Sequence, residues 1–209
     1  MIYLGVEMTP EEDQQPIYTI LHKVTGRRQE LAIGGVEEKF PEAAVMMAIA
    51  FYILENTTDS EIAIHPDGQH ANQFDIQAFL AANNFEKSES KGTTAYGGLY
   101  QRENKTLTVF PKSGLGDVVS DSLVVECKGG TINSNYAGVS SQLRRSLFEV
   151  VGQLMAREPD GKRMVAAVPF TTETEKWAVK LAPRCRSAAI EVALMNSDGS
   201  IVWATDPGD

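Results

Sequence analysis

Apolar residues recur at steps of three and four along several stretches of the chain, which is the spacing of a helix with one buried face. This pattern predicts a helix that begins at Pro41 and ends near Asn56, a second over 74–84 and a third over 139–156. A further helix is predicted over 172–181. The chain therefore alternates helical stretches with segments of a different period.

Short runs rich in Val, Ile, Leu and Thr, bounded by glycine or polar turns, predict strands between these helices. They cover 61–65, 99–102, 106–110, 115–120, 123–128, 164–169, 190–195 and 200–204. The first 40 residues give mixed signals, with short strands expected at 2–6 and 17–21, and 129–138 is predicted as a polar loop. The order from residue 98 onward predicts an α/β fold, a mixed central sheet flanked by helices.

Composition indicates a soluble globular protein, because 43% of the 209 residues are hydrophobic and 22% are charged. The longest apolar stretch, 43–54, is well short of the roughly 20 residues that cross a bilayer, and no apolar leader opens the chain. Two cysteines provide no disulfide framework, which suits a reducing compartment. We therefore expect a cytoplasmic protein without a membrane partner.

Charge is distributed unevenly along the chain. The formal net charge of −9 argues against a nucleic-acid partner, because phosphate binding depends on Lys and Arg. Residues 1–90, however, hold 15 acidic and 5 basic residues (net −10), whereas 91–209 hold 13 acidic and 14 basic residues (net +1). The stretch 139–186 is basic, with nine bases against five acids. We therefore expect an acidic N-terminal elaboration over 1–90 joined to a core over 91–209 that a polyanion can approach.

The segment 115–128 carries the residues with the clearest chemistry. A two-residue loop at 121–122 would place Asp117 directly opposite Glu126 on a β-hairpin. Carboxylates on cross-strand partners repel each other, so this pairing makes sense with a positive group between them. Strand alternation puts Glu126 and Lys128 on the same face. Carboxylate oxygens suit Mg²⁺, and an adjacent ammonium can orient an attacking water or help to deprotonate it.

These residues resemble the PD-(D/E)XK nuclease superfamily, which has the restriction-endonuclease-like fold. The resemblance rests on Asp117, an eight-residue spacer and Glu126-Cys127-Lys128, on a hairpin followed by a helix and a strand, and it covers about 106–170. It implies a nuclease that cleaves DNA, in which Asp117 and Glu126 bind a catalytic Mg²⁺ or Mn²⁺ and Lys128 is the catalytic lysine. Gly116 stands where the family usually has proline.

Members of the superfamily often add an acid from an earlier helix and a polar residue from the helix after the lysine. Glu42 is the candidate for the acid, with Asp75 and Glu55 as alternatives, and Gln142 is the candidate for the polar residue. Arg144 and Arg145, near the start of the later helix, are candidates for phosphate contact.

Other functions fit the same residues. A non-catalytic protein of this fold could serve as a binding or scaffold subunit, with the acidic region 1–90 docking a basic partner. The acids could instead serve a small-molecule phosphohydrolase, or form a solvated charge cluster on an exposed hairpin. We expect DNA in preference to RNA, and both a protein partner and a homo-oligomer stay open.

Overall fold

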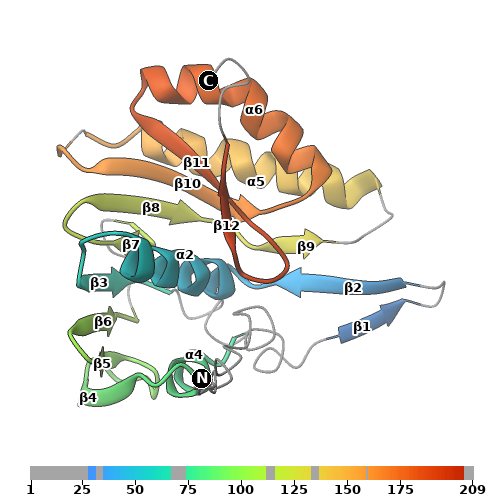
Figure 1. Cartoon of the computed structure of the whole chain (residues 1–209). Coiled ribbons are helices and arrows are strands. Elements are labelled where there is room, and N and C mark those ends of the chain that lie inside the picture. The colour runs from blue at the N-terminus through green and yellow to red at the C-terminus, as the bar shows by residue number, and fades with distance from the viewer. Residues whose placement is uncertain are drawn as a thin grey trace, which may run out of the picture.

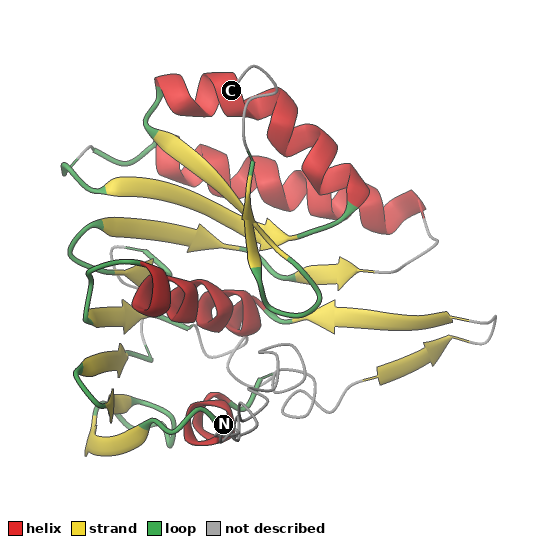
Figure 2. Ribbon diagram, viewed as in Figure 1, coloured by secondary structure: helices red, strands yellow, loops and turns green. Residues whose placement is uncertain are grey.

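The computed structural model describes residues 28–31, 35–66, 74–111, 116–132, 137–158 and 160–204. They form an α/β fold in which a nine-stranded mixed sheet is flanked by four described helices (Figures 1 and 2). The predicted fold class is therefore confirmed. The strands expected at 2–6 and 17–21 lie outside the described residues.

The large sheet has the strand order β12-β11-β10-β8-β7-β3-β6-β5-β4. Its strands are β3 (Glu61–Ile64), β4 (Glu86–Ser90), β5 (Gly98–Arg102), β6 (Lys105–Val109), β7 (Val118–Val119), β8 (Leu123–Cys127), β10 (Arg163–Pro169), β11 (Ile190–Met195) and β12 (Ile201–Trp203). Strands β8, β10 and β11 run parallel, and β7 is antiparallel to both of its neighbours. Strands β3 and β4 come no later than residue 90, near which the charge of the chain changes, and their neighbours β5, β6 and β7 come after it. Segments from both sides of residue 90 therefore form one sheet.

A second, three-stranded sheet joins β1 (Arg28–Leu31), β2 (Gly35–Phe40) and β9 (Gly130–Ile132). The prediction of a polar loop over 129–138 is wrong at β9, which pairs antiparallel with β2. Strand β4 was also not predicted, because its residues are polar and mostly exposed. Strand β9 forms by backbone pairing with the distant β2 and β4 by pairing with the neighbouring β5, so neither strand needs a hydrophobic period of its own.

The helices are α2 (Glu42–Asn56), α4 (Ile76–Ala82), α5 (Ala137–Met155) and α6 (Thr172–Ser187). Helix α2 packs in one apolar cluster with Val125 and Val165, while α5 and α6 pack in another with Met164 and Ala166, so the two clusters lie on opposite faces of the sheet. Helix α6 continues six residues beyond the predicted end and through Pro183, because Ala182 and Cys185 extend its buried face. Neither this helix nor any other described one is long and apolar enough to span a bilayer.

The junction between the two sheets fixes the position of the candidate site. Strand β2 ends at Phe40 and leads directly into α2, and Phe40 pairs with Gly130 of β9. Strand β8 ends at Cys127, and two residues separate it from β9. The first residue of α2 and the residue that follows β8 are therefore held side by side.

Candidate active site

The hairpin formed by β7 and β8 has the predicted register. Val118 pairs with Val125 and Val119 with Val124, so the connecting loop holds residues 121–122 as expected. The amide N of Asp117 donates a hydrogen bond to the carbonyl O of Val125 at 2.9 Å, which places Asp117 opposite Glu126. The predicted cross-strand pair of carboxyl groups is confirmed.

Asp117 is partly buried and lies among other charged groups. Its Oδ2 accepts a hydrogen bond from the amide N of Cys127 at 2.7 Å. Burial raises the pKa of Asp117 to about 7, and the negative charges of Glu126 and Glu42 raise it as well, against the lowering effects of the Cys127 amide and Lys128. Burial is the largest of these effects, and the two neighbouring acids add to it.

Glu42 is the acid that the structure places beside the catalytic-lysine candidate. It is the first residue of α2, only 7% exposed, and its Oε2 lies 3.1 Å from Nζ of Lys128. The alternatives lie elsewhere. Glu55, near the other end of α2, pairs with Arg102 and Lys105, and Asp75 accepts a hydrogen bond from the amide N of Ala78 to cap α4. Long-range packing thus places Glu42, the acid preferred from the sequence, beside Lys128 and places the two alternatives elsewhere.

Lys128 lies between two carboxylates. Its Nζ is 3.1 Å from Glu42 and 3.6 Å from Oε1 of Glu149, which is on α5. Burial alone would lower the pKa of Lys128, but Glu42, Glu149 and Asp117 outweigh burial and raise it. The ammonium therefore keeps its proton at neutral pH and acts as a fixed positive charge and hydrogen-bond donor.

Glu126 has a partner that the sequence analysis did not identify. Nη2 of Arg157, two residues beyond the end of α5, forms an ion pair with Oε1 of Glu126. The Glu126 side chain is 10% exposed and that of Arg157 is 28% exposed. Arg157 belongs to the basic stretch seen in the sequence, but no local spacing distinguishes it from the other bases there.

The remaining candidates lie on two sides of α5. Gln142, Arg145 and Glu149 are spaced by three and four residues, so they share one side of the helix, and all three are exposed. The Arg144 guanidinium lies 5.4 Å from the ring centre of Trp177 on α6. Arg145 therefore lies on the side of Lys128, whereas Arg144 supports the packing of α5 against α6.

The donor set of the site suits a hard divalent cation. Mg²⁺ is usually held by one or two carboxylates together with waters, and Glu42, Asp117 and Glu126 offer carboxylate oxygens close enough to one another to affect the pKa of Asp117. In the described part of the chain, no three Asp, Glu, His or Cys side chains are already arranged to hold a metal ion. Each of these carboxyl groups is bound by a protein group, so a cation would compete with Lys128 and Arg157 for oxygens.

Comparison with known proteins gives no relative. No protein-family model, no curated protein and no solved structure matches the chain.

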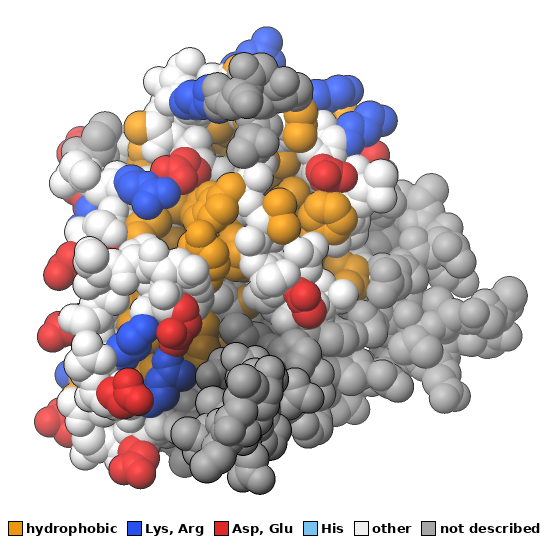
Figure 3. All heavy atoms as spheres, in the orientation of Figure 1, with side chains coloured by type: hydrophobic (Ala, Val, Ile, Leu, Met, Phe, Trp, Pro, Cys, Tyr) orange, Lys and Arg blue, Asp and Glu red, His pale blue; other side chains and the backbone are white. Residues whose placement is uncertain are grey.

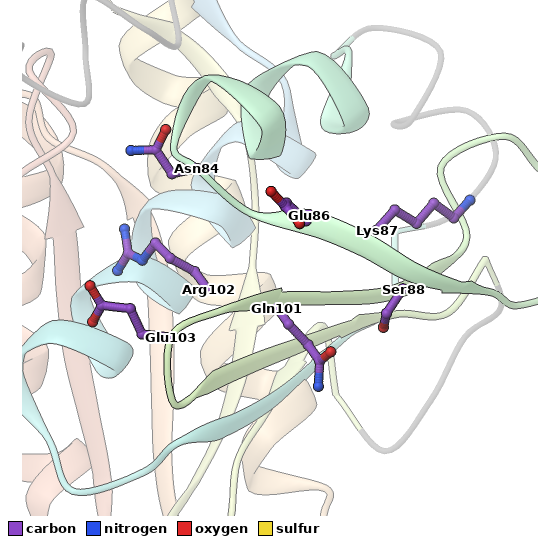
Figure 4. Close-up of a pocket in the computed structure, with 7 residues that line it drawn as sticks. All are labelled: Asn84, Glu86, Lys87, Ser88, Gln101, Arg102 and Glu103. Carbon is purple, nitrogen blue, oxygen red and sulfur yellow. The ribbon is translucent and has the colours of Figure 1, made fainter.

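A polar pocket is also present elsewhere in the sheet. It lies at the β4–β5 edge and is lined by Asn84, Glu86, Lys87, Ser88, Gln101, Arg102 and Glu103 (Figure 4). Strands β6 and β3 separate this edge from the β7–β8 hairpin. Arg102 already pairs with Glu55 and lies 4.8 Å from the ring centre of Phe85, which gives it a structural role.

The surface also carries charge unevenly. On the face shown in Figure 3, Lys and Arg side chains gather at the end where Figure 1 places α6, and an apolar patch lies near the centre. Helix α6 contributes Lys176, Lys180, Arg184 and Arg186 to the basic stretch. A polyanion would meet a locally favourable field there despite the net charge of the chain.

Proposed function

We propose that this protein is a divalent-metal-dependent nuclease that hydrolyses phosphodiester bonds in DNA. The observation that carries the proposal is the meeting of Glu42, Asp117, Glu126 and Lys128, from α2, the β7 edge and the end of β8, around one spot. Like charges gathered at a partly buried site cost stability, which favours a function for them. The expected cation is Mg²⁺ or Mn²⁺, with Asp117 and Glu126 as ligands and Glu42 as a third.

In this proposal the cation would polarise the phosphate and activate the attacking water. Lys128 orients that water and offsets the negative charge that develops on the phosphate oxygens, because its ammonium stays protonated. The water oxygen forms a new bond to phosphorus and one bridging phosphorus–oxygen bond breaks. The water releases a proton to solvent, and the departing oxygen takes one from solvent.

Contacts to the DNA would come from α5. Arg145 and Gln142 lie on the same side of this helix as Glu149, which reaches Lys128, so they are placed to bind phosphates that flank the reacting one. Arg144 is the weaker of the two arginine candidates because it lies against Trp177. We propose a cytoplasmic location, to which the two buried free cysteines, Cys127 and Cys185, are suited.

The test is cleavage of single-stranded DNA, double-stranded DNA and RNA by the purified protein with Mg²⁺, with Mn²⁺ and with a chelator. We expect cleavage of DNA that requires the cation, and a loss of at least about a hundredfold in kcat/KM in E126Q and K128A, because E126Q removes a ligand of the cation and K128A removes the ammonium that acts on the water and the phosphate.

Lys105 provides a matched control. It pairs with Glu55 near the end of α2 as Lys128 pairs with Glu42 at its start, and the two lysine side chains are 21% and 25% exposed. K105A should therefore keep wild-type kcat/KM. Cation-dependent cleavage that survives in both E126Q and K128A would contradict the assigned roles.

A second candidate function is a non-catalytic binding or scaffold subunit. It is favoured by one observation, that Glu42 and Glu126 already pair with Lys128 and Arg157 within the protein. Titration calorimetry with Mn²⁺ separates the two candidates, because a scaffold would bind no cation at these residues. Absence of both heat and cleavage, with a stable complex formed with a basic protein, would favour the scaffold.

A further inference from the structure

The Arg157–Glu126 pair differs from an ordinary structural ion pair in the same chain. Arg163 binds Glu191 through two parallel hydrogen bonds, from Nε at 2.8 Å and from Nη2 at 2.7 Å. This bidentate geometry gives both donors on that edge of the guanidinium an oxygen acceptor. Arg157 binds Glu126 through Nη2, and its Nε is buried with no hydrogen-bond partner among the described residues.

The guanidinium of Arg157 therefore lacks an oxygen acceptor for its Nε. An unpaired buried donor of this kind lowers the stability of the fold. A phosphate group carries two non-bridging oxygens at the spacing that the Nε and Nη edge recognises. Arg157 is also the more exposed member of the pair, at 28% against 10% for Glu126, so solvent reaches part of its side chain.

Resting on the proposed function, we infer that Arg157 is a substrate-binding residue that occupies Glu126 in the free protein and binds the substrate phosphate when a divalent cation takes its place. The cation and Arg157 compete for Glu126, because both need its carboxylate. A guanidinium released from Glu126 remains beside the place where the phosphate would lie. Binding of the cation would therefore favour binding of the substrate, and the coupling is reciprocal.

The inference is tested in the full chain with R157Q, R157K and the control R163Q, which removes an equal charge from the structural pair. The first measurement is Mn²⁺ binding by calorimetry. R157Q should bind Mn²⁺ about fivefold more tightly than wild type, because the competing cation is gone. R163Q should match wild type.

The second measurement is binding of a short single-stranded deoxyoligonucleotide in Mn²⁺, with each variant placed on K128A to prevent hydrolysis. R157Q should bind about tenfold more weakly than K128A alone, because a charge-assisted hydrogen bond to phosphate is lost. R157K keeps the charge without the planar edge, so it should fold and also bind the oligonucleotide more weakly. If R157Q does not fold, R157K decides the matter.

The outcomes separate the inference from the proposed function. Unchanged or weaker Mn²⁺ binding in R157Q, or oligonucleotide binding by R157K equal to that of its parent, would overturn the inference and leave Arg157 as a structural partner of Glu126. Failure of wild type and R163Q alike to bind Mn²⁺ would instead overturn the metal site, and the inference with it.

Discussion

At the scale of single residues, the pKa of Asp117 reflects the burial and the charges of the whole site. Its carboxyl group is partly buried, accepts a hydrogen bond from the Cys127 amide and lies near two other acids. Because burial and these charges raise its pKa from 3.8 to about 7, the folded protein binds a proton at Asp117 more tightly than the unfolded chain does. The contribution of this group to stability is therefore present below pH 4 and is lost as the pH rises through 7.

This predicts the effect of D117N in a chelator. Between pH 4 and pH 8 the free energy of unfolding of wild type should fall relative to that of D117N, by on the order of 3 kcal/mol, because asparagine has no proton to lose. Urea unfolding across this pH range measures the difference. D121N, in the exposed hairpin loop, controls for the loss of an aspartate. Parallel curves for wild type and D117N would show that Asp117 does not titrate in this range.

At the scale of elements, the connection from β8 to β9 requires glycine. A Cβ atom on Gly129 would lie 2.3 Å from the carbonyl O of Phe40 and 2.6 Å from the amide N of Glu42. Both contacts are with backbone, which cannot move aside as a flexible side chain can. The close approach holds Lys128 beside the start of α2, so Gly129 supports the site without taking part in its chemistry.

G129A should therefore destabilise the protein by about 1–3 kcal/mol, because the two segments must separate. It should also lower cleavage activity by moving Lys128 away from Glu42. G152A in α5 is the control, since a Cβ there meets nothing within 4 Å, and alanine in a helix should raise stability by up to about 1 kcal/mol. Thermal unfolding and the cleavage assay measure both variants. Wild-type stability in G129A would contradict the proposed role of the close approach.

For the whole molecule, the site joins elements from both apolar clusters and lies where the two sheets meet. Glu42 begins a helix that packs in one cluster, whereas Ala166, the partner of Glu126 in register, belongs to the other. A cation held by Glu42, Asp117 and Glu126 would join elements that are far apart in the chain. It would bind the folded state alone and so stabilise the entire fold.

Mn²⁺ at a hundredfold excess over its Kd should raise the free energy of unfolding by about 2.7 kcal/mol. E126Q should lose most of this gain, while E191Q, which alters the structural pair with Arg163, should keep it. The midpoint of thermal unfolding with and without Mn²⁺ provides the measurement. An equal gain in E126Q and E191Q would show that the cation binds elsewhere.

The sequence by itself determined the local part of the site. A two-residue loop and strand alternation suffice to place Asp117 opposite Glu126, because pairing within a hairpin depends on neighbouring residues alone. The period of three and four residues likewise predicted α2 and α5. These features are set by backbone geometry over a few residues, which a single sequence displays directly.

Only the tertiary structure decided which distant residues complete the site. Sequence spacing did not fix the choice of Glu42 over Glu55 and Asp75, and the pairing of β2 with β9 brought Glu42 alone of the three to Lys128. The sequence does not distinguish Arg157 from the other eight bases in 139–186, and the structure shows that it forms an ion pair with Glu126. Such contacts depend on the tertiary packing of segments that are distant in sequence, and local hydrophobic periodicity does not predict that packing.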